Sequence, residues 1–253
     1  MKTFVSHDGP LAYAEAGSGA GPLVVLLHSG YTDHTTWGHQ LTALAERFHV
    51  VAPDLRGHGE SANASRPFRQ ADDVAALVRH LDAGPAVLAG VSMGAFAAVE
   101  TALEHPGAVR ALVLSGGGVA EPPPGHDPLE PPPVPEFPSD WPLSLLHRKD
   151  PETVRVLREA LARTFAKHTA DEDNPLVPVP DAAARVGAGE LSALPVLALD
   201  GEYEEPGHLA CTAAVTGAAT RGESVRVPGA LHLPNMENPQ AYNRELFAFL
   251  DSL

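Results

Sequence analysis

A chain of 253 residues is long enough for one sizeable α/β or all-β domain and short for two full ones. Acidic residues outnumber basic ones 32 to 17, and the net charge of −15 argues against nucleic acid or an anionic membrane as the main partner, because both require a positive footprint. The single cysteine, Cys211, excludes an internal disulfide framework and a thiolate metal cluster.

The N-terminal residues indicate neither export nor membrane insertion. Residues 1–5 contain one lysine and lead into the polar stretch 6–10, with no apolar run of signal-peptide length. Nowhere does the chain approach the roughly 18 apolar residues of a membrane-spanning helix. We therefore expect a cytoplasmic protein.

The first half of the chain alternates between predicted strands and helices. A short strand at 11–16 precedes continuous apolar runs at 23–27, 49–52, 86–89 and 111–114, which are typical of strands buried on both faces. In the segments between these strands, the spacing of apolar residues predicts amphipathic helices, and the segment after 86–89 is rich in alanine. Strands and helices that alternate at this spacing imply a mostly parallel sheet with helices on both faces.

The alternation breaks after residue 115 and resumes after residue 190. Residues 121–142 contain ten prolines, which neither a central strand nor a helix interior tolerates. A helix is predicted from Pro151, and strands at 195–199 and 224–227 then return before a last amphipathic helix. We predict an α/β core made of residues 1–115 and 191–253, with residues 116–190 inserted as a helical, proline-rich lid.

The strongest local signal is the motif Gly90-Val-Ser92-Met-Gly94. It follows a predicted strand and opens a predicted helix, so Ser92 would stand on a sharp turn that needs small neighbours. Such a turn lifts the hydroxyl to the helix N-terminus, where free backbone N–H groups can bind an oxyanion. The pattern points to a serine nucleophile.

A serine nucleophile needs a base and an orienting carboxylate, and the C-terminal part of the chain supplies both. His232 lies after a predicted strand, and Glu204 lies just past the strand 195–199. Open α/β sheets place ligands at the carboxyl ends of their strands. The chain order Ser92, Glu204, His232 is the order of serine, acid and histidine in one hydrolase architecture.

With these motifs together, the sequence resembles the α/β-hydrolase fold superfamily, in the branch of small esterases, lactonases and related lid-bearing hydrolases. The resemblance covers about residues 10–115 and 190–253. It rests on five segments in the family's order: Leu26-Leu-His28-Ser-Gly30 with Trp37, Val51 to Ser61, Gly90 to Gly94, Leu194 to Glu204, and Gly229-Ala-Leu-His232-Leu-Pro.

The resemblance implies an oxyanion hole built from the backbone N–H groups of Gly30 and Met93. It also implies that His28, Asp54 and Arg56, like His58, fix loops and take no direct part in catalysis.

Two residues depart from the family pattern. Ser29 stands where glycine is usual, and its hydroxyl would either add a donor or fill space. The acid is Glu204 in place of the usual aspartate, which makes it one methylene longer. Three further carboxylates, Asp200, Glu202 and Glu205, lie close enough in sequence to leave the assignment of the acid open.

Other chemistries find less support. The glycine-rich stretch at 17–21 precedes a strand and lacks a following Lys-Ser/Thr, which argues against nucleotide binding. The 13 histidines form no H-E-x-x-H or similar ligand set, so we predict neither a metal nor a cofactor. A haloalkane dehalogenase or epoxide hydrolase of this fold would need aspartate at position 92.

We predict a serine hydrolase that cleaves a small or medium carboxylic ester, lactone or thioester through an acyl-enzyme. The partner is a small-molecule substrate, and the sequence does not predict an oligomeric state. Two alternatives stay open: a carbon–carbon bond hydrolase or biosynthetic lyase or cyclase that uses His232 as base, and a non-catalytic binding protein. The candidate substrate-binding residues are Ser29, Tyr31, Phe137, Trp141, Leu145 and Phe165.

Overall fold

The structure, a computed structural model, describes residues 1–17, 21–120, 141–167 and 176–253, apart from the side chains at 141 and 142. Most of the predicted proline-rich stretch at 121–142 therefore lies outside the described residues. The strands are β1 (Lys2–Ser6), β2 (Gly9–Ala16), β3 (Leu23–Leu27), β4 (His49–Pro53), β5 (Ala86–Val91), β6 (Val109–Ser115), β7 (Pro195–Gly201) and β8 (Arg221–Val227).

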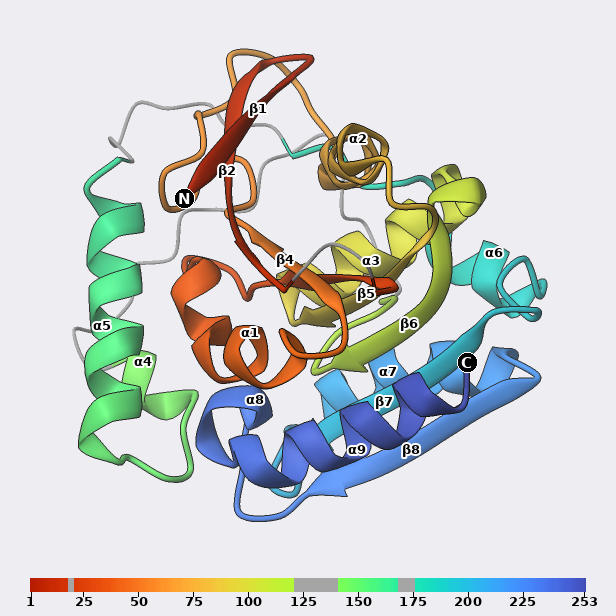
Figure 1. The fold of residues 1–253 in the computed structure, drawn as a ribbon. Coiled ribbons are helices and arrows are strands. Elements are labelled where there is room, and N and C mark those ends of the chain that lie inside the picture. Colours follow the sequence, from red (N-terminus) through yellow and green to blue (C-terminus); the bar gives the residue numbers. More distant parts are fainter. Residues whose placement is uncertain (18–20, 121–140, 168–175) are drawn as a thin grey trace, which may run out of the picture.

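Helices connect these strands (Figure 1). The α-helices are α1 (Gly38–Leu44), α2 (Gln70–Leu81), α3 (Met93–Glu104), α4 (Trp141–Ser144), α5 (Pro151–Phe165), α6 (Ala182–Gly187), α7 (Pro206–Ala218), α8 (Pro234–Glu237) and α9 (Pro239–Asp251). The short 3-10 helices are η1 (His34–Trp37) and η2 (Pro106–Ala108). No helix in the described part of the chain is long and apolar enough to cross a bilayer.

The strands form one sheet in the order β1-β2-β4-β3-β5-β6-β7-β8. Pairing is parallel from β4 through β8 and antiparallel for β1 with β2 and β2 with β4, which confirms the mostly parallel sheet. The chain passes from β3 to β4 on one side and then to β5 on the other. The direction of chain progression thus reverses between β3 and β5, and open α/β sheets bind their ligands at the carboxyl ends of the strands at such a point.

Side chains of the central strands alternate between two apolar layers. Leu23, Val25 and Leu27 of β3 pack in the layer that contains α2 and α3, whereas Val24 and Leu26 pack in the layer that contains Trp37 and α9. Helices α1 and α9 contact each other on this second face (Figure 1). Burial on both faces explains why the central strands are continuous apolar runs.

Strand β1 was not predicted from the sequence. Its inward-facing positions are Phe4 and Ser6, while Val5 points outward and is 84% exposed. Ser6 is buried because its hydroxyl donates to Asp73 Oδ1 at 2.5 Å. A polar residue inside and an apolar residue outside reverse the alternation that identifies a half-buried strand.

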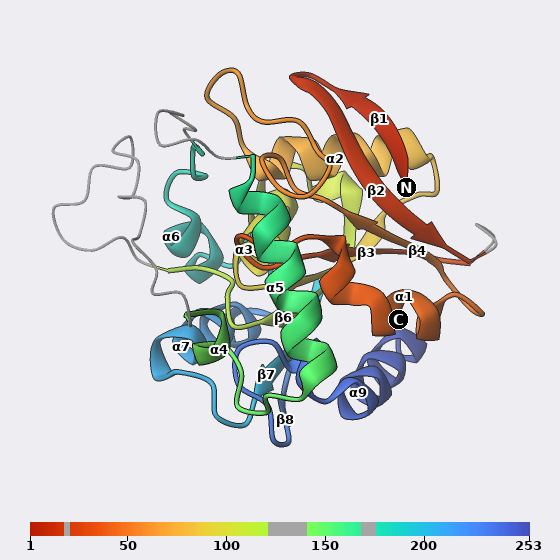
Figure 2. The same cartoon turned by 90° about the vertical axis from the view of Figure 1, so that its left-hand side faces the viewer.

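The chain leaves the sheet at the end of β6 and returns at β7, and α4, α5 and α6 lie between them. Helix α5 begins where the sequence predicts, because Asp150 accepts the N–H of Thr153 at 3.0 Å and Pro151 occupies the first turn. Leu157 and Leu161 bury their side chains in the layer of α1 and α9. Figure 2 shows α5 lying across the core, in front of the sheet.

Candidate active site

The predicted catalytic residues all follow the carboxyl ends of strands. Gly30 comes after β3, Ser92 directly after β5, Glu204 after β7 and His232 after β8. Because parallel strands point the same way, these four loops meet at one edge of the sheet. The reversal of strand order between β3 and β5 lies at the centre of this edge.

Ser92 stands on a strained turn between β5 and α3. Its backbone has φ 53° and ψ −117°, a conformation that a side-chain-bearing residue adopts at a cost of about 1–3 kcal/mol. A Cβ on Gly90 would lie 2.3 Å from the Gly94 carbonyl carbon, and a Cβ on Gly94 would lie 2.1 Å from Leu27 O. The turn therefore closes only with glycine at both positions, as the motif predicts.

The first turn of α3 lies against the loop that follows β3. A Cβ on Gly30 would sit 3.9 Å from the Cβ of Met93, so the two residues are neighbours. Met93 is the first residue of α3, where a helix offers no intrahelical acceptor for the N–H group. This placement suits the two predicted oxyanion donors.

His28 fixes this loop from the inside. It is fully buried, its Nε2 accepts the Leu55 N–H at 2.9 Å, and its Nδ1 lies 2.8 Å from Ser29 O. Burial lowers the pKa of His28, so the ring is held neutral. Asp54, also fully buried, accepts the backbone N–H groups of His34 and Glu60. These contacts agree with the structural roles expected for His28 and Asp54.

His232 is hydrogen-bonded to Glu204 at the opposite side of the site. Nδ1 of His232 lies 2.8 Å from Oε2 of Glu204, and both side chains are buried. The two loops are joined by backbone contacts as well, since the Tyr203 N–H donates to Ala230 O at 3.0 Å. A Cβ on Gly201 would lie 2.0 Å from Leu231 O, which shows how closely they pack.

Glu204 is held in its ionised form. Burial opposes ionisation, but hydrogen bonds from His208 and His232 outweigh it and lower the pKa of Glu204 to about 2. A carboxylate is an acceptor only, so the Nδ1 atoms of both histidines carry the protons. Neutral His232 therefore presents an unprotonated Nε2, which is the tautomer a general base needs.

The neighbouring carboxylates make other contacts. Asp200, buried at the end of β7, accepts the Gly116 N–H at 2.9 Å and the Thr212 hydroxyl at 2.7 Å. Glu202 and Glu205 are exposed. Of the four acids left open by the sequence, Glu204 is the one whose carboxylate contacts His232.

Two consecutive glycines after β6 lie between the serine turn and the histidine–glutamate pair. A Cβ on Gly116 would lie 2.7 Å from Glu204 Oε2 and 2.8 Å from His232 Cε1. A Cβ on Gly117 would lie 2.5 Å from Ser92 O. The structure therefore brings Ser92, His232 and Glu204 around one glycine pair, which the sequence analysis did not single out.

Only part of the predicted substrate-binding set is described. The Tyr31 and Phe165 rings stack at 5.5 Å with 17° between their planes, and Phe165 is 43% exposed. Leu145 O accepts the His232 N–H at 3.2 Å, so the insertion reaches the histidine loop. Ser29 is buried beside Gly30. Phe137 and the side chain of Trp141 lie outside the described residues.

His208 is a further residue at the site that the sequence analysis missed. Its Nδ1 lies 2.9 Å from Glu204 Oε1, and its ring centre is 4.5 Å from that of His232. The sequence does contain a hint, because His208 comes four residues after Glu204. That spacing brings the two side chains together only because α7 begins at Pro206.

Among the residues that the structure describes, two clusters each bring three potential metal ligands within 4.8 Å of one another. They are Glu204 with His208 and His232, and Asp33 with His34 and Asp54. In the first, both histidines already donate to the carboxylate; in the second, His34 Nδ1 lies 2.7 Å from Asp54 Oδ1. Direct hydrogen bonds account for these contacts.

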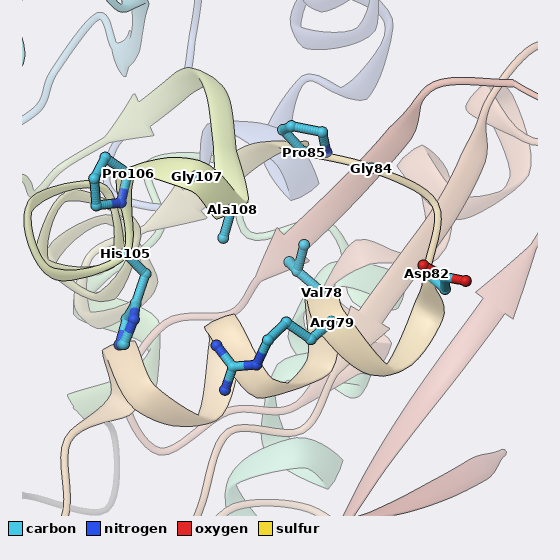
Figure 3. A pocket seen from close by; sticks show the side chains of 9 residues that line it. All are labelled: Val78, Arg79, Asp82, Gly84, Pro85, His105, Pro106, Gly107 and Ala108. Carbon is cyan, nitrogen blue, oxygen red and sulfur yellow. The ribbon is translucent and has the colours of Figure 1, made fainter.

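A surface pocket of about 470 Å³ lies at the other end of the strands (Figure 3). It is formed by the end of α2 and by the turns that precede β5 and β6, with Arg79, Asp82 and His105 among its lining residues. The strands begin at this edge and end at Ser92 and Gly116. This pocket is therefore separate from the candidate active site.

These features define a hydrolase fold of the α/β class. They are the order of the strands in the sheet, the strained turn at Ser92, and the acid and histidine that follow β7 and β8. A family model described as alpha/beta hydrolase fold matches residues 22–186 of the chain. The chain belongs to this family, which confirms the resemblance and the predicted fold class.

Individual relatives agree with this assignment. The chain is 36% identical over 98 residues to 2-(acetamidomethylene)succinate hydrolase of Mesorhizobium japonicum, a match that covers 38% of this chain and 35% of that protein. It is 28% identical over 116 residues to 3-oxoadipate enol-lactonase 2 of Acinetobacter baylyi, covering 45% and 43% respectively. The matches thus span less than half the length of these curated relatives.

Solved structures match over nearly the whole chain. A thermophilic esterase from Thermogutta terrifontis superposes with a TM-score of 0.80 at 25% identity, covering 99% of this chain and 98% of that one. The enol-lactonase from Burkholderia xenovorans LB400 has a TM-score of 0.76 at 20% identity, with 99% and 100% covered, and shows the shared fold. Together these findings support a hydrolase enzyme.

Proposed function

We propose that the protein is a serine hydrolase that cleaves a small or medium carboxylic ester, lactone or thioester. The observation that carries this proposal is the buried His232–Glu204 pair beside the glycines that also pack against Ser92. A base with a fixed tautomer next to a serine on a strained turn is the arrangement that acyl transfer requires. Relatives named as an esterase and an enol-lactonase act on bonds of this kind, as their names state.

Hydrolysis proceeds in two steps, acylation of Ser92 and hydrolysis of the acyl-enzyme. Ser92 Oγ attacks the substrate carbonyl while His232 Nε2 takes the hydroxyl proton, and the N–H groups of Gly30 and Met93 stabilise the oxyanion. The carbonyl then re-forms, the bond to the leaving oxygen or sulfur breaks, and that atom receives the proton from His232. Water, deprotonated by His232, hydrolyses the acyl-enzyme by the same route and regenerates Ser92.

The substrate side of the site is proposed from the contacts of the insertion. The stacked rings of Tyr31 and Phe165 offer an apolar wall next to the oxyanion loop, and Leu145 adjoins His232. We place Ser29, Phe137 and Trp141 in the same substrate-binding set, with residues 116–190 as the cover. The net charge of −15 disfavours strongly anionic substrates, so a neutral acyl compound is the expected partner.

The test is Ser92→Ala against the unchanged protein, with a series of p-nitrophenyl esters and lactones of increasing chain length. We expect kcat/KM to fall by about 10³-fold or more and covalent labelling by a fluorophosphonate to disappear. Ser224→Ala, which removes an exposed hydroxyl on β8, is the matched control and should behave like the unchanged protein.

Two results would overturn the proposal. One is an unchanged protein that neither hydrolyses these substrates nor reacts with the fluorophosphonate. The other is a Ser92→Ala variant that retains most of its activity on the preferred substrate while His232→Ala loses it, because a base-only mechanism such as a lyase or cyclase would then be at work.

A further inference from the structure

The carboxylate of Glu204 is shared between two histidines. Oε2 accepts from His232 Nδ1 at 2.8 Å, while Oε1 accepts from His208 Nδ1 and from the Glu205 N–H, both at 2.9 Å. Glu204 is almost fully buried, whereas the side chain of His208 is 44% exposed. His208 therefore lies on the solvent side of the Glu204 carboxylate.

Glutamate needs this support more than aspartate does. Its side chain has one more torsion, and the terminal torsion of a carboxylate is broad, so a glutamate oxygen is less well fixed than that of aspartate. A hydrogen bond to Oε2 alone would fix the rotation of the carboxylate plane only weakly. The Glu205 N–H and His208 Nδ1 both donate to Oε1, and His208 is the side chain of the two donors. Together with His232 on Oε2, they determine the plane of the carboxylate.

The backbone places His208 for this task. Glu205 has extended dihedrals, φ −63° and ψ 140°, and Pro206 then starts α7, so His208 stands on the first turn of the helix directly after the acid loop. The same turn directs the Glu205 N–H to Oε1. The acid loop and α7 thus form one unit around the carboxylate.

We propose that His208 is a positioning residue that fixes the carboxylate of Glu204 so that Oε2 stays on His232 Nδ1. This inference rests on the proposed function, in which the acid orients His232. In this arrangement the extra methylene of glutamate is compensated because His208, together with the Glu205 N–H, holds Oε1 while Oε2 contacts His232.

The proposal requires a hydrogen-bond donor at position 208. Replacements of His208 with and without a donor should therefore differ in activity. His208→Asn keeps an amide N–H near the place of Nδ1, and His208→Leu keeps an apolar side chain of moderate size without a donor. We expect kcat to fall about 10- to 100-fold in His208→Leu, with KM changed less than about twofold. In His208→Asn, kcat should recover to within about threefold of the unchanged protein.

His105→Leu is the matched control. His105 also pairs with a carboxylate, Nε2 lying 2.8 Å from Asp72 Oδ1, but it lines the pocket at the opposite end of the strands. Its loss should leave kcat and KM unchanged. A second readout is the rate of fluorophosphonate labelling of Ser92, which should fall in His208→Leu in proportion to kcat.

The outcomes also separate this inference from the proposed function. If the unchanged protein hydrolyses esters and His208→Leu matches it in kcat, the positioning role is overturned and the hydrolase stands. Equal losses in His208→Asn and His208→Leu, with folding retained by circular dichroism, would also overturn it. An unchanged protein without turnover or labelling would instead contradict the proposed function.

Discussion

At the scale of single residues, the acid of the site decides how its base is oriented. Glu204 has a pKa of about 2, because hydrogen bonds from two histidines outweigh the effect of burial, so it is ionised at every pH at which the protein is expected to work. In Glu204→Gln the amide cannot balance the imidazolium that forms during acyl transfer. We expect kcat to fall about 10²- to 10⁴-fold.

The measurement is a pH profile of kcat/KM for the variant and the unchanged protein on one p-nitrophenyl ester. Glu223→Gln, on the exposed part of β8, removes a carboxylate of the same type and serves as the control. If Glu204→Gln were as active as this control, another group would have to orient His232.

The sequence favoured Glu204 as the acid but could not exclude its neighbours Asp200, Glu202 and Glu205. Asp200 ends the strand and has the usual side chain for the family, yet it is occupied by the Gly116 N–H and Thr212. The choice depends on where the turn after β7 directs each side chain, and that direction is a property of the folded loop. His208 was missed for the same reason.

At the scale of elements, the loop after β6 acts as a spacer between the serine turn and the histidine–glutamate pair. Gly116 has φ +57°, and a Cβ there would approach both Glu204 and His232 within 3 Å. Gly116→Ala should therefore displace the pair and lower kcat about 100-fold or more, in addition to a backbone cost of about 1–2 kcal/mol.

Gly107→Ala provides the comparison, since a Cβ at Gly107 meets no heavy atom within 4 Å in the described structure. Steady-state kinetics and thermal melting of the two variants separate the effects: Gly116→Ala should lose far more activity than stability. Ordinary kcat in Gly116→Ala would show that the pair tolerates the extra methyl group.

Helix α5 is attached to the oxyanion loop by an ion pair. Arg163 Nε donates to Asp33 Oδ2 at 2.7 Å, and Asp33 is fully buried, so removing the guanidinium leaves a buried carboxylate with its Thr35 contacts alone. Because the side chain of Arg163 is 40% exposed, we expect Arg163→Ala to cost about 1 kcal/mol of unfolding free energy. KM should rise as the Tyr31–Phe165 wall loosens.

The pH dependence of this loss has a definite sign. Burial alone would raise the pKa of Asp33, but hydrogen bonds from Arg163 and Thr35 hold it below the ordinary value of 3.8. A lowered carboxyl pKa stabilises the fold fully above the unfolded value, and the contribution is lost as the pH falls through the folded value. Urea unfolding should therefore separate Arg163→Ala from the unchanged protein at pH 7, and the difference should shrink as the pH falls below 3.8.

Arg158→Ala, at an exposed position of the same helix, is the control for helix propensity and charge. A variant at Arg163 that unfolds at the same urea concentration as this control at pH 7 would show that the ion pair contributes nothing.

The elements themselves were largely predictable, and the exceptions have physical causes. Buried parallel strands are continuous apolar runs, so β3, β4, β5, β6 and β7 were located from the sequence within one to two residues at most ends. In β1 the local alternation is reversed by exposed Val5 and buried Ser6. Its strand identity comes from pairing with β2, a contact that no local pattern records.

At the scale of the whole molecule, one buried ion pair joins parts that the sheet alone does not connect. The guanidinium of Arg56, in the loop after β4, donates through Nε and Nη2 to both oxygens of Asp73 on α2, each at 2.7 Å. It also donates to Asp8 O in the turn between β1 and β2, while Ser6 donates to Asp73. The N-terminal hairpin, α2 and the loop beside the oxyanion segment therefore depend on one another.

Breaking this pair from one side should destabilise the entire fold. Arg56→Met removes from the buried Asp73 the guanidinium that binds both of its oxygens. Asp73→Leu leaves the buried Arg56 with only the more distant carboxylate of Asp8, 3.8 Å from Nη1. Each should cost about 3–5 kcal/mol, because desolvation of the remaining charge is no longer offset. For a chain of this size that corresponds to a fall in Tm of roughly 6–20 °C.

The double variant Arg56→Met/Asp73→Leu removes both charges, so it should lose less stability than either single variant. Arg47→Met, which breaks the exposed pair with Asp251, controls for loss of an arginine and should leave Tm nearly unchanged. Thermal and urea unfolding of the unchanged protein, the two single variants and the double variant together form a double-mutant cycle. Additive losses in the double variant would mean that Arg56 and Asp73 act separately, and the hairpin and α2 would then be anchored by apolar packing alone.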